Sequence, residues 1–472
     1  MEIRTPVNVS VQGETHTNSP PLRWHQARIG LTLLPPVLAM FFLSLVSEPW
    51  ARGQAYSWTT IAGSGARGSA DGTNSAAGFY EPAGLAVDSA GNIYVTDKWN
   101  FTIRKIVPAG TNWVVSTIAG SVGVAGSRDG TNSQARFDQP TGVAVDSGGS
   151  VYVADRANDT IRKLTPVGTN WWVFTIAGSA NGPGSQDGVY IAAHFNLPNG
   201  ISVDGSGNMF VADGGNDTVR RMVQVEYYWA VSTIAGVAGS GGSADGTNRG
   251  ARFIYPSGAA PDNSGNVYVT DQNNSTIRKL APSGTNWVVS TIAGLAPNYG
   301  TADGTNSAAR FFYPGGLAVD SSGNIYVADM DNNAVRKVSP SGTNWVVSTI
   351  GGICAGSRGL TDGIGSAARF NGPNGVALDS RGNVYVADQF NHAIRRGIPL
   401  PVAQTPTLTN DTLTLNWGVA VGQILQVQYT TDLGQPNWTN LGDQLVCTNC
   451  TMKVPDSVTG GAQRFYRVLV MP

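Results

Sequence analysis

The sequence has few of the residues from which metal centres and catalytic sites are usually built. Among 472 residues there are 3 cysteines and 4 histidines, and only His194 and His392 follow the N-terminal leader. A zinc site needs several such ligands converging on one point, so the chain offers little for one. Charged residues make up 13% of the chain and the net charge is −1. This balance gives no electrostatic reason to expect nucleic acid or an acidic membrane surface as a partner.

The few cysteines leave room for one small disulfide. Cys447 and Cys450 are separated by two residues and can close a short loop in an oxidising compartment. As a metal site this pair lacks the second pair of ligands that would make the motif strong. Cys354 stands alone in the sequence, and we expect it to be a buried or partly buried thiol.

Long hydrophobic runs are also missing, apart from one near the N-terminus. Ile29–Val46 is almost wholly apolar and follows a polar segment that ends with basic residues. Gly53, Gln54 and Ala55 then offer the small residues of a cleavage site, so residues 1–55 are predicted to be a signal peptide. The alternative is an uncleaved membrane anchor, because the run is near the length needed to span. Either way we expect an exported protein: secreted, periplasmic or on the cell surface.

Glycine is plentiful, at 60 residues, and a unit of nearly constant length recurs along the chain. Each copy has Pro-x-Gly, an inner apolar run, an Asp-x-x-Gly-Asn turn, Tyr-Val-Ala/Thr-Asp and Asn-x-Thr/Ala-Ile/Val-Arg, with small variations. Short β-branched runs separated by Gly, Asn and Asp are typical of antiparallel strands and tight turns. The regular repeat predicts an all-β protein, a closed propeller with four strands in each blade. The aspartates that end the second run lie 58, 58, 58, 58 and 59 residues apart, at Asp97, Asp155, Asp213, Asp271, Asp329 and Asp388.

The fourth strand of the repeat predicts how the ring closes. The segment Thr-Ile-Ala/Gly-Gly occurs six times, and its first copy, at Thr60, precedes the first unit. Nothing similar follows the sixth unit, which ends near Ile398. We therefore expect a six-bladed propeller over residues 56–398, closed by Trp58–Gly63 as the outer strand of the last blade. This pairing would cover the sheet edge that an open ring exposes.

Gly316–Val338 shows the repeat in its most regular form, from Gly-Leu-Ala-Val-Asp through Ile-Tyr-Val-Ala-Asp to Val-Arg-Lys-Val. This pattern, with Asn391-His392-Ala393-Ile394 in the sixth unit, resembles the NHL repeat. The longer connections, with Asp-Gly and Ala-Arg-Phe, are similar to those of bacterial secreted NHL proteins and of the NHL propeller of teneurins. The resemblance implies the fold and leaves activity open, since NHL propellers include binding modules, sensor domains and a few metal-dependent lyases.

The C-terminal part of the chain does not follow the repeat. Residues 399–406 are rich in proline and are predicted to be a stiff, extended linker. Residues 407–472 contain short alternating runs such as Leu413–Trp417 and Phe465–Val470, which predict a small β-sandwich-like module. Trp417 and the Tyr466-Arg467 strand resemble fibronectin type III-like modules.

One face of the predicted ring carries residues that differ from blade to blade. If strands run in order from inside to outside, this face holds the long connections between blades and the turns after the repeated Asp. A repeated scaffold with unlike loops is where binding is commonly found. The predicted binding residues are Tyr80, Glu81, Lys98, Trp99, Asp138, Gln139, Arg156, Tyr255, Phe312, Tyr313, Met330, Asp331, Gln389 and Phe390.

These residues mix aromatics, amides and a few charges, which suits a protein, peptide or carbohydrate ligand. We therefore expect a non-catalytic binding or scaffold protein, a monomer, with no cofactor, no nucleic-acid partner and no membrane contact beyond the leader. Any single aromatic can instead pack between blades. The alternative function is a hydrolase or lyase with Ca²⁺ or Zn²⁺ in the central channel, although the inner strands carry Leu, Ala, Val and Ile. A calcium site of carboxylates and amides stays open.

The repeated Asp and Arg residues are expected to be structural. Asp97 and its five equivalents each stand at the start of a turn, where an Asp side chain commonly accepts hydrogen bonds from backbone amides of the turn. Arg104 and its equivalents are expected to pair with acidic neighbours between blades.

Overall fold

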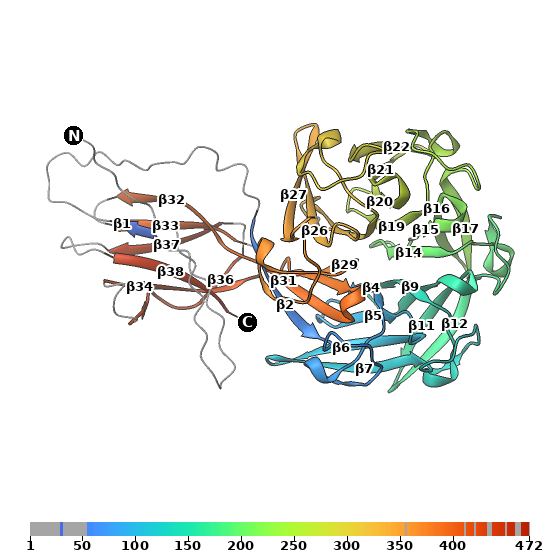
Figure 1. Ribbon diagram of the computed structural model, residues 1–472, viewed down its shortest axis with the longest axis horizontal. Coiled ribbons are helices and arrows are strands. Elements are labelled where there is room, and N and C mark those ends of the chain that lie inside the picture. Colours follow the sequence, from blue (N-terminus) through green and yellow to red (C-terminus); the bar gives the residue numbers. More distant parts are fainter. Residues whose placement is uncertain are drawn as a thin grey trace.

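The computed structural model describes residues 29–31, 54–354, 356–409, 412–419, 422–431, 437–448, 451–457 and 464–471. Six antiparallel sheets are arranged as the blades of a propeller, and two smaller sheets form a C-terminal module (Figure 1). The expected all-β, six-bladed fold is confirmed. Most of the leader lies outside the described residues, apart from Gln54, Ala55 and strand β1 (Ile29–Leu31). Within the described residues, no helix has the length and apolar character needed to cross a membrane.

Each blade is built from four main strands, which run from the channel to the rim. The innermost strands are β4 (Pro82–Val87), β9 (Pro140–Val145), β14 (Pro198–Val203), β19 (Pro256–Pro261), β24 (Pro314–Val319) and β29 (Pro373–Leu378). The second strands are β5 (Ile93–Asp97), β10 (Val151–Asp155), β15 (Met209–Asp213), β20 (Val267–Asp271), β25 (Ile325–Asp329) and β30 (Val384–Asp388). The third strands are β6 (Thr102–Ala109), β11 (Thr160–Val167), β16 (Thr218–Val225), β21 (Thr276–Ser283), β26 (Ala334–Ser341) and β31 (Ala393–Pro399). The fourth strands are β7 (Asn112–Gly120), β12 (Asn170–Gly178), β17 (Tyr228–Gly236), β22 (Asn286–Ala293), β27 (Asn344–Gly352) and β2 (Tyr56–Ala62).

A short fifth strand extends each blade beyond the four strands that the repeat predicts. These two-residue strands are β3 (Gly72–Thr73), β8 (Gly130–Thr131), β13 (Gly188–Val189), β18 (Gly246–Thr247), β23 (Gly304–Thr305) and β28 (Gly363–Ile364). A one-turn 3₁₀ helix follows each of them: η1 (Asn74–Ala76), η2 (Asn132–Gln134), η4 (Tyr190–Ala192), η6 (Asn248–Gly250), η8 (Asn306–Ala308) and η9 (Gly365–Ala367). Another follows the repeated Asp in four blades: η3 (Arg156–Asn158), η5 (Gly214–Asn216), η7 (Gln272–Asn274) and η10 (Gln389–Asn391).

The ring closes as the sequence predicts, because the N-terminal strand β2 pairs with β31 of the sixth blade. Trp58 of this strand is fully buried and donates its indole N–H to the carbonyl of Ile350 at 2.9 Å. The ring of Trp58 meets Phe370 edge to face, with the ring centroids 5.1 Å apart. The first and last parts of the propeller are therefore joined in one sheet.

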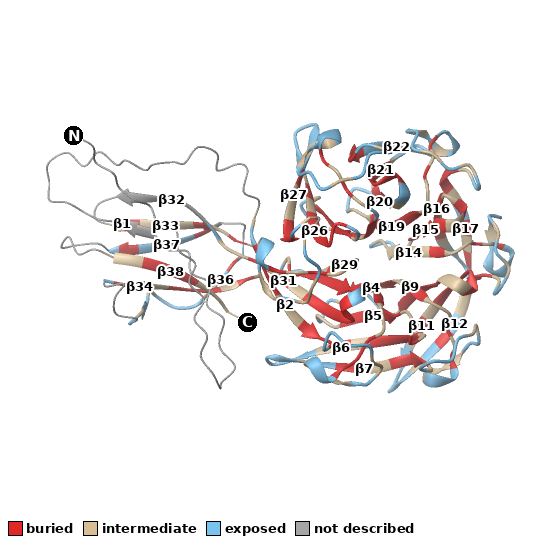
Figure 2. Ribbon diagram, in the orientation of Figure 1, coloured by how far each residue is buried: buried red, intermediate tan, exposed pale blue. Residues whose placement is uncertain are grey.

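The hydrophobic core is divided among the spaces between neighbouring blades. The second strand of every blade is buried along its whole length, as in Ile93–Asp97 (Figure 2). Tyr94 and Ile103 of blade one, for example, pack with Val143 and Val153 of blade two. β-branched residues suit such strands because they fill both faces of a pleated sheet.

The C-terminal module has two sheets with buried side chains between them. One contains β32 (Val402–Thr409), β33 (Thr412–Gly418) and β37 (Thr451–Ser457). The other contains β1, β38 (Arg464–Met471), β34 (Ile424–Thr430), β35 (Thr439–Asn440) and β36 (Leu445–Val446). Trp417 of one sheet and Val427 of the other share a buried cluster with Cys447. Cys450, the proposed disulfide partner of Cys447, lies outside the described residues.

The predicted linker at residues 399–406 includes the beginning of a strand. β32 forms one edge of the three-stranded sheet, and its register with β33 shifts between Gln404 and Thr407. Pro406 lies within this irregularity, and proline is tolerated at bulges and on edge strands because it has no amide donor for the ladder. The segment is extended, as its prolines predict, and the part within β32 also pairs with β33.

Candidate functional site

The two sets of unlike residues meet on one face of the ring, which we call the variable face. It is formed by the two residues before each inner-strand Pro and the two residues after each repeated Asp. In every blade, a backbone N–H of the second set donates to a carbonyl of the first, as from Trp99 to Tyr80. The repeated Asp fixes the same loop, because Asp97 Oδ1 accepts the Tyr80 N–H at 2.7 Å. The expected proximity of the two sets is therefore present in all six blades.

The residue before each inner-strand Pro has a left-handed backbone. Five of these six residues are not glycine: Glu81, Gln139, Leu197, Tyr255 and Tyr313 have φ between 50° and 54°. This conformation costs a residue other than glycine about 1 kcal/mol or more. Strained positions of this kind cluster at ligand sites, and here they direct unlike side chains towards one face.

Glu81 joins the residues of blades six and one. Its carboxylate accepts the indole N–H of Trp99 at 2.8 Å and a side-chain N–H of Gln389 at 3.1 Å. Gln389 is buried, and its carbonyl oxygen accepts from Asn374 at 2.8 Å. Trp99 and Gln389 therefore help to organise the face as well as to line it.

Arg156 reaches across the whole of blade three to Tyr255. Its Nη2 and Nε donate to the Tyr255 hydroxyl at 2.6 and 3.2 Å, and its Nη1 lies 3.5 Å from Gln139 Oε1. The intervening position is Gly214, where a Cβ atom would lie 3.3 Å from the Tyr255 ring. The missing side chain in blade three thus makes room for a contact between blades two and four.

Lys98 lies on the same side of the variable face as Arg156. Its ammonium is 5.2 Å from the centre of the Trp99 ring, and among the described residues it has no hydrogen-bond partner. Burial lowers the pKa of Lys98, the charge of Arg156 lowers it further, and Glu81 opposes both effects. Lys98 and Arg156 therefore lie close enough for their charges to interact, and the Glu81 carboxylate also acts on Lys98.

Aromatic rings gather on the other side, at blades five and six. Phe312 stacks on Tyr299, with centroids 4.4 Å apart and planes 17° apart, and Tyr313 follows at 5.3 Å from Phe312. Phe390 occupies the space that a side chain on Gly372 would need. Tyr313 and Phe390 are both 41% exposed, so their rings are accessible.

The remaining predicted residues also lie on the variable face. Met330 is partly buried, and Asp331 is exposed with its backbone N–H bonded to the Phe312 carbonyl. Burial raises the pKa of Asp331, and Arg358 opposes the rise. Burial also raises the pKa of Asp138. These two carboxyl groups are the acidic members of the face besides Glu81.

The repeat matches a known family. The NHL repeat model matches residues 79–106, 137–164, 311–338 and 370–396, which lie in blades one, two, five and six. The chain is 26% identical over 357 residues to NHL repeat-containing protein 2 of Gallus gallus, covering 66% of this chain and 46% of that protein. It is 30% identical over 239 residues to teneurin-1 of Mus musculus, covering 44% of this chain and 8% of that protein. The chain is an NHL-repeat β-propeller.

Further comparisons agree on the fold. Protein SUPPRESSOR OF QUENCHING 1, chloroplastic, of Arabidopsis thaliana is 26% identical over 333 residues, which are 66% of this chain and 30% of that protein. The chain thus spans less than half the length of these relatives. A Bacteroides thetaiotaomicron protein of unknown function superposes with a TM-score of 0.55 at 22% identity, over 73% of this chain and 76% of that chain. An auxiliary nutrient binding protein of the same organism superposes with a TM-score of 0.54 at 17% identity, over 74% and 78%.

The name-giving histidine position of the NHL repeat joins neighbouring blades in this propeller. His392 Nδ1 accepts the backbone N–H of Glu81, the left-handed residue of the next blade, at 3.2 Å. Asp159, Asp217 and Asn333 occupy the same position in other blades. Their side chains accept the N–H of the corresponding residues Leu197, Tyr255 and Gly372 at 2.8, 2.8 and 3.0 Å. Sequence reasoning missed this role, although the recurrence of oxygen or nitrogen acceptors after the repeated Asn could have indicated it.

Sequence reasoning also missed three residues of the variable face. Tyr299 and Arg67 come from the long connections between blades, and Asn374 follows an inner-strand Pro. Arg67 lies 4.9 Å from the centre of the Tyr80 ring. Tyr299 and Arg67 lie 13 residues before the variable pairs that they contact, and Asn374 lies just after its pair, on the inner strand that we did not treat as variable.

The recurring Asp and Arg residues of the NHL propeller are structural, and they pair within blades. Arg162 is fully buried and bonds Asp155 and Asp129 of its own sheet, each at 2.7 Å. Its guanidinium also lies 5.0 Å from the centre of the Phe137 ring. The expectation of pairing between blades was wrong, because the loop before each inner strand folds back onto the same blade. Burial raises the pKa of Asp155 to about 6 against the opposing charge of Arg162.

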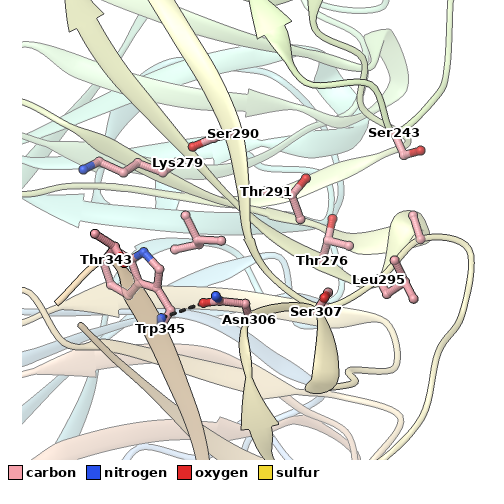
Figure 3. A pocket seen from close by; sticks show the side chains of 13 residues that line it. Ser243, Thr276, Lys279, Ser290, Thr291, Leu295, Asn306, Ser307, Thr343 and Trp345 are labelled. Atoms are coloured by element: carbon pink, nitrogen blue, oxygen red, sulfur yellow. Dashed lines mark hydrogen bonds between the residues drawn. The ribbon is translucent and has the colours of Figure 1, made fainter. Parts of the chain in front are cut away.

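A second hollow lies away from the variable face. A cavity of about 610 Å³ opens between blades four and five, with Lys279, Thr291, Asn306 and Trp345 among its lining residues (Figure 3). These residue types recur at the same positions of most other blades, and Asn306 accepts the Trp345 N–H as its equivalents do. The unlike residues are on the variable face, so we place the candidate site there. Among the described residues, no group of three or more His, Cys, Asp or Glu is placed to hold a metal ion.

Proposed function

We propose that the chain is an exported, non-catalytic protein that binds a protein, peptide or glycan through the variable face of its NHL propeller. The observation that carries the proposal is the convergence of unlike aromatic, amide and charged side chains onto one face of a repeated scaffold. Five left-handed residues that are not glycine direct them there. The fold is shared with a solved auxiliary nutrient binding protein, and this likeness supports a binding role.

The test is binding to an array of defined glycans and peptides by residues 54–472. The variant Tyr313→Ala with Phe390→Ala removes two exposed rings from the variable face. Its matched control is Tyr227→Ala, in the turn between β16 and β17, where the side chain is 91% exposed. We expect the double variant to lose at least tenfold in affinity and the control to bind as the unchanged protein does.

The melting temperature is measured for all three proteins. We expect all three to unfold within about 2 °C of one another, since exposed side chains contribute little to stability. Equal binding by the double variant would refute the assignment of the variable face. Turnover of an array ligand, lost with the same variant, would instead support a catalytic site.

A further inference from the structure

The charges of the variable face are distributed unevenly. Lys98 and Arg156 lie on neighbouring blades, and among the described residues neither has a carboxylate within ion-pair distance. Glu81 and Asp159 are the acids whose charges act on these two cations. Glu81 accepts hydrogen bonds from neutral donors, Trp99 and Gln389, and Asp159 accepts the backbone N–H of Leu197. An ammonium and a guanidinium, neither with an ion-pair partner among the described residues, therefore lie close enough for their charges to interact, and we call this part of the face the corner.

The two cations retain donors for a ligand. An ammonium has three N–H donors, and Lys98 uses none of them on the described residues. A guanidinium has five, and Arg156 directs three at Tyr255 and Gln139. Burial and the nearby Arg156 charge both lower the pKa of Lys98, so the charged ammonium is disfavoured where it lies. An anion bound between the two groups would relieve this cost.

The rest of the face presents flat rings and amides. Phe312 stacks on Tyr299, and Tyr313 is tilted by 51° against Phe312, so the three rings offer a ledge of aromatic surface at blade five. Gln272 and Asn273 bring side-chain amides from blade four, and Asn273 is exposed. Aromatic faces with convergent amide donors suit a pyranose ring, whose C–H groups stack and whose hydroxyls need partners.

We propose that the ligand of the variable face is an acidic polysaccharide, with a uronate carboxylate between Lys98 and Arg156 and neighbouring sugar rings on the aromatic ledge. This proposal rests on the proposed function and narrows it to one class of ligand. The charge-assisted contacts would fix one sugar unit, and stacking would align the chain across the face.

Three polymers test the proposal. Polygalacturonate carries both the rings and the carboxylates, its methyl ester carries the same rings without charge, and poly-L-glutamate carries carboxylates without sugar rings. We expect residues 54–472 to bind polygalacturonate at least tenfold more tightly than either of the others, with affinity that falls as salt is raised. Binding is measured by isothermal titration at pH 7.

The variant Lys98→Gln removes one cation of the corner, and Lys279→Gln removes one from the cavity between blades four and five. We expect about a tenfold loss for the first and no change for the second.

Other results would overturn the proposal. Equal binding of polygalacturonate and its methyl ester, lost with Tyr313→Ala, would refute the anionic corner and keep the proposed glycan-binding function. If poly-L-glutamate bound as tightly as polygalacturonate, or more tightly, the proposal that the bound carboxylate belongs to a sugar would be refuted. If none of the three polymers bound, an acidic polysaccharide would not be the ligand. The proposed binding function is tested separately, by the array of glycans and peptides.

Discussion

The closing strand of the ring depends on one large side chain that fills space left by two glycines. At the position of Trp58, the fourth strands of the other five blades carry valine. At the positions of Gly351 and Gly397, the other blades carry alanine and a larger aliphatic residue, respectively. A Cβ on Gly397 would lie 2.7 Å from the Trp58 ring, and a Cβ on Gly351 would overlap its Nε1. Three departures from the repeat therefore form one packing unit.

Substitutions at this seam should be strongly non-additive. Trp58→Val removes most of a fully buried indole and should cost about 3 kcal/mol in unfolding free energy. Gly397→Ile overfills the site and should cost a similar amount. Together they restore the Val and Ile pair found in blade one, so the double variant should recover about 2–3 kcal/mol relative to the sum. The pairing of β2 with β31 supports this estimate, because Trp58 and Gly397 are directly opposite.

The assay is urea denaturation of residues 54–472 followed by circular dichroism, for the unchanged protein, both single variants and the double variant. A coupling free energy below about 0.5 kcal/mol would mean that the two residues act independently. That result would refute the view that Trp58 closes the ring by filling the space above Gly397. Limited proteolysis adds an independent measure, since a displaced β2 should be cut first.

Two further substitutions test other contacts. Burial and the charge of Arg67 lower the pKa of His392, and the charge of Glu81 opposes them. The neutral imidazole accepts the Glu81 N–H through Nδ1. As pH falls below about 6.5, histidine in the unfolded chain protonates first, so the folded protein loses stability. His392→Asn keeps an acceptor without titrating, so the difference in melting temperature between the two proteins should change between pH 7.5 and 5, and a constant difference would contradict this. Asp155→Ala leaves buried Arg162 without its buried carboxylate and should cost about 3–5 kcal/mol in urea denaturation. If Asp129→Ala, which removes the exposed second partner, lowered the free energy of unfolding as much as Asp155→Ala does, burial of the pair would not be what matters.

Much of the fold could be predicted because the chain repeats itself. The spacing of Asp97 and its equivalents predicts the blades, and the displaced copy at Thr60 predicts closure. The fifth strand, such as Gly72–Thr73, could not be predicted, because two paired residues leave no periodic pattern. The strand Val402–Thr409 was hidden by its prolines, which an edge strand tolerates.

The sequence predicted which residues lie together on the variable face, but only some of the contacts among them. The two variable sets meet as the strand order requires, because both lie at the same ends of their strands. The contact between Arg156 and Tyr255 joins residues 99 positions apart across an entire blade. It depends on the absence of a side chain at Gly214, which no pattern in the sequence indicates. Tyr299 was missed for a similar reason, since only the folded loop brings it to Phe312.

The variable face can change its side chains because its backbone is held by the repeated Asp in every blade and, for four of the six loops, by an acceptor from the neighbouring blade. Asp97 and its equivalents bond the loop before each inner strand, and acceptors such as Asp217 bond the next blade. A backbone held at both points presents its side chains with little freedom, which reduces the entropy lost when a ligand binds. Left-handed strain at Tyr255 is tolerated for the same reason, since two hydrogen-bonded neighbours define that conformation. Under the proposed function, ligand selectivity would depend on side chains that can be exchanged without disturbing the ring, apart from Trp99 and Gln389, which hold Glu81.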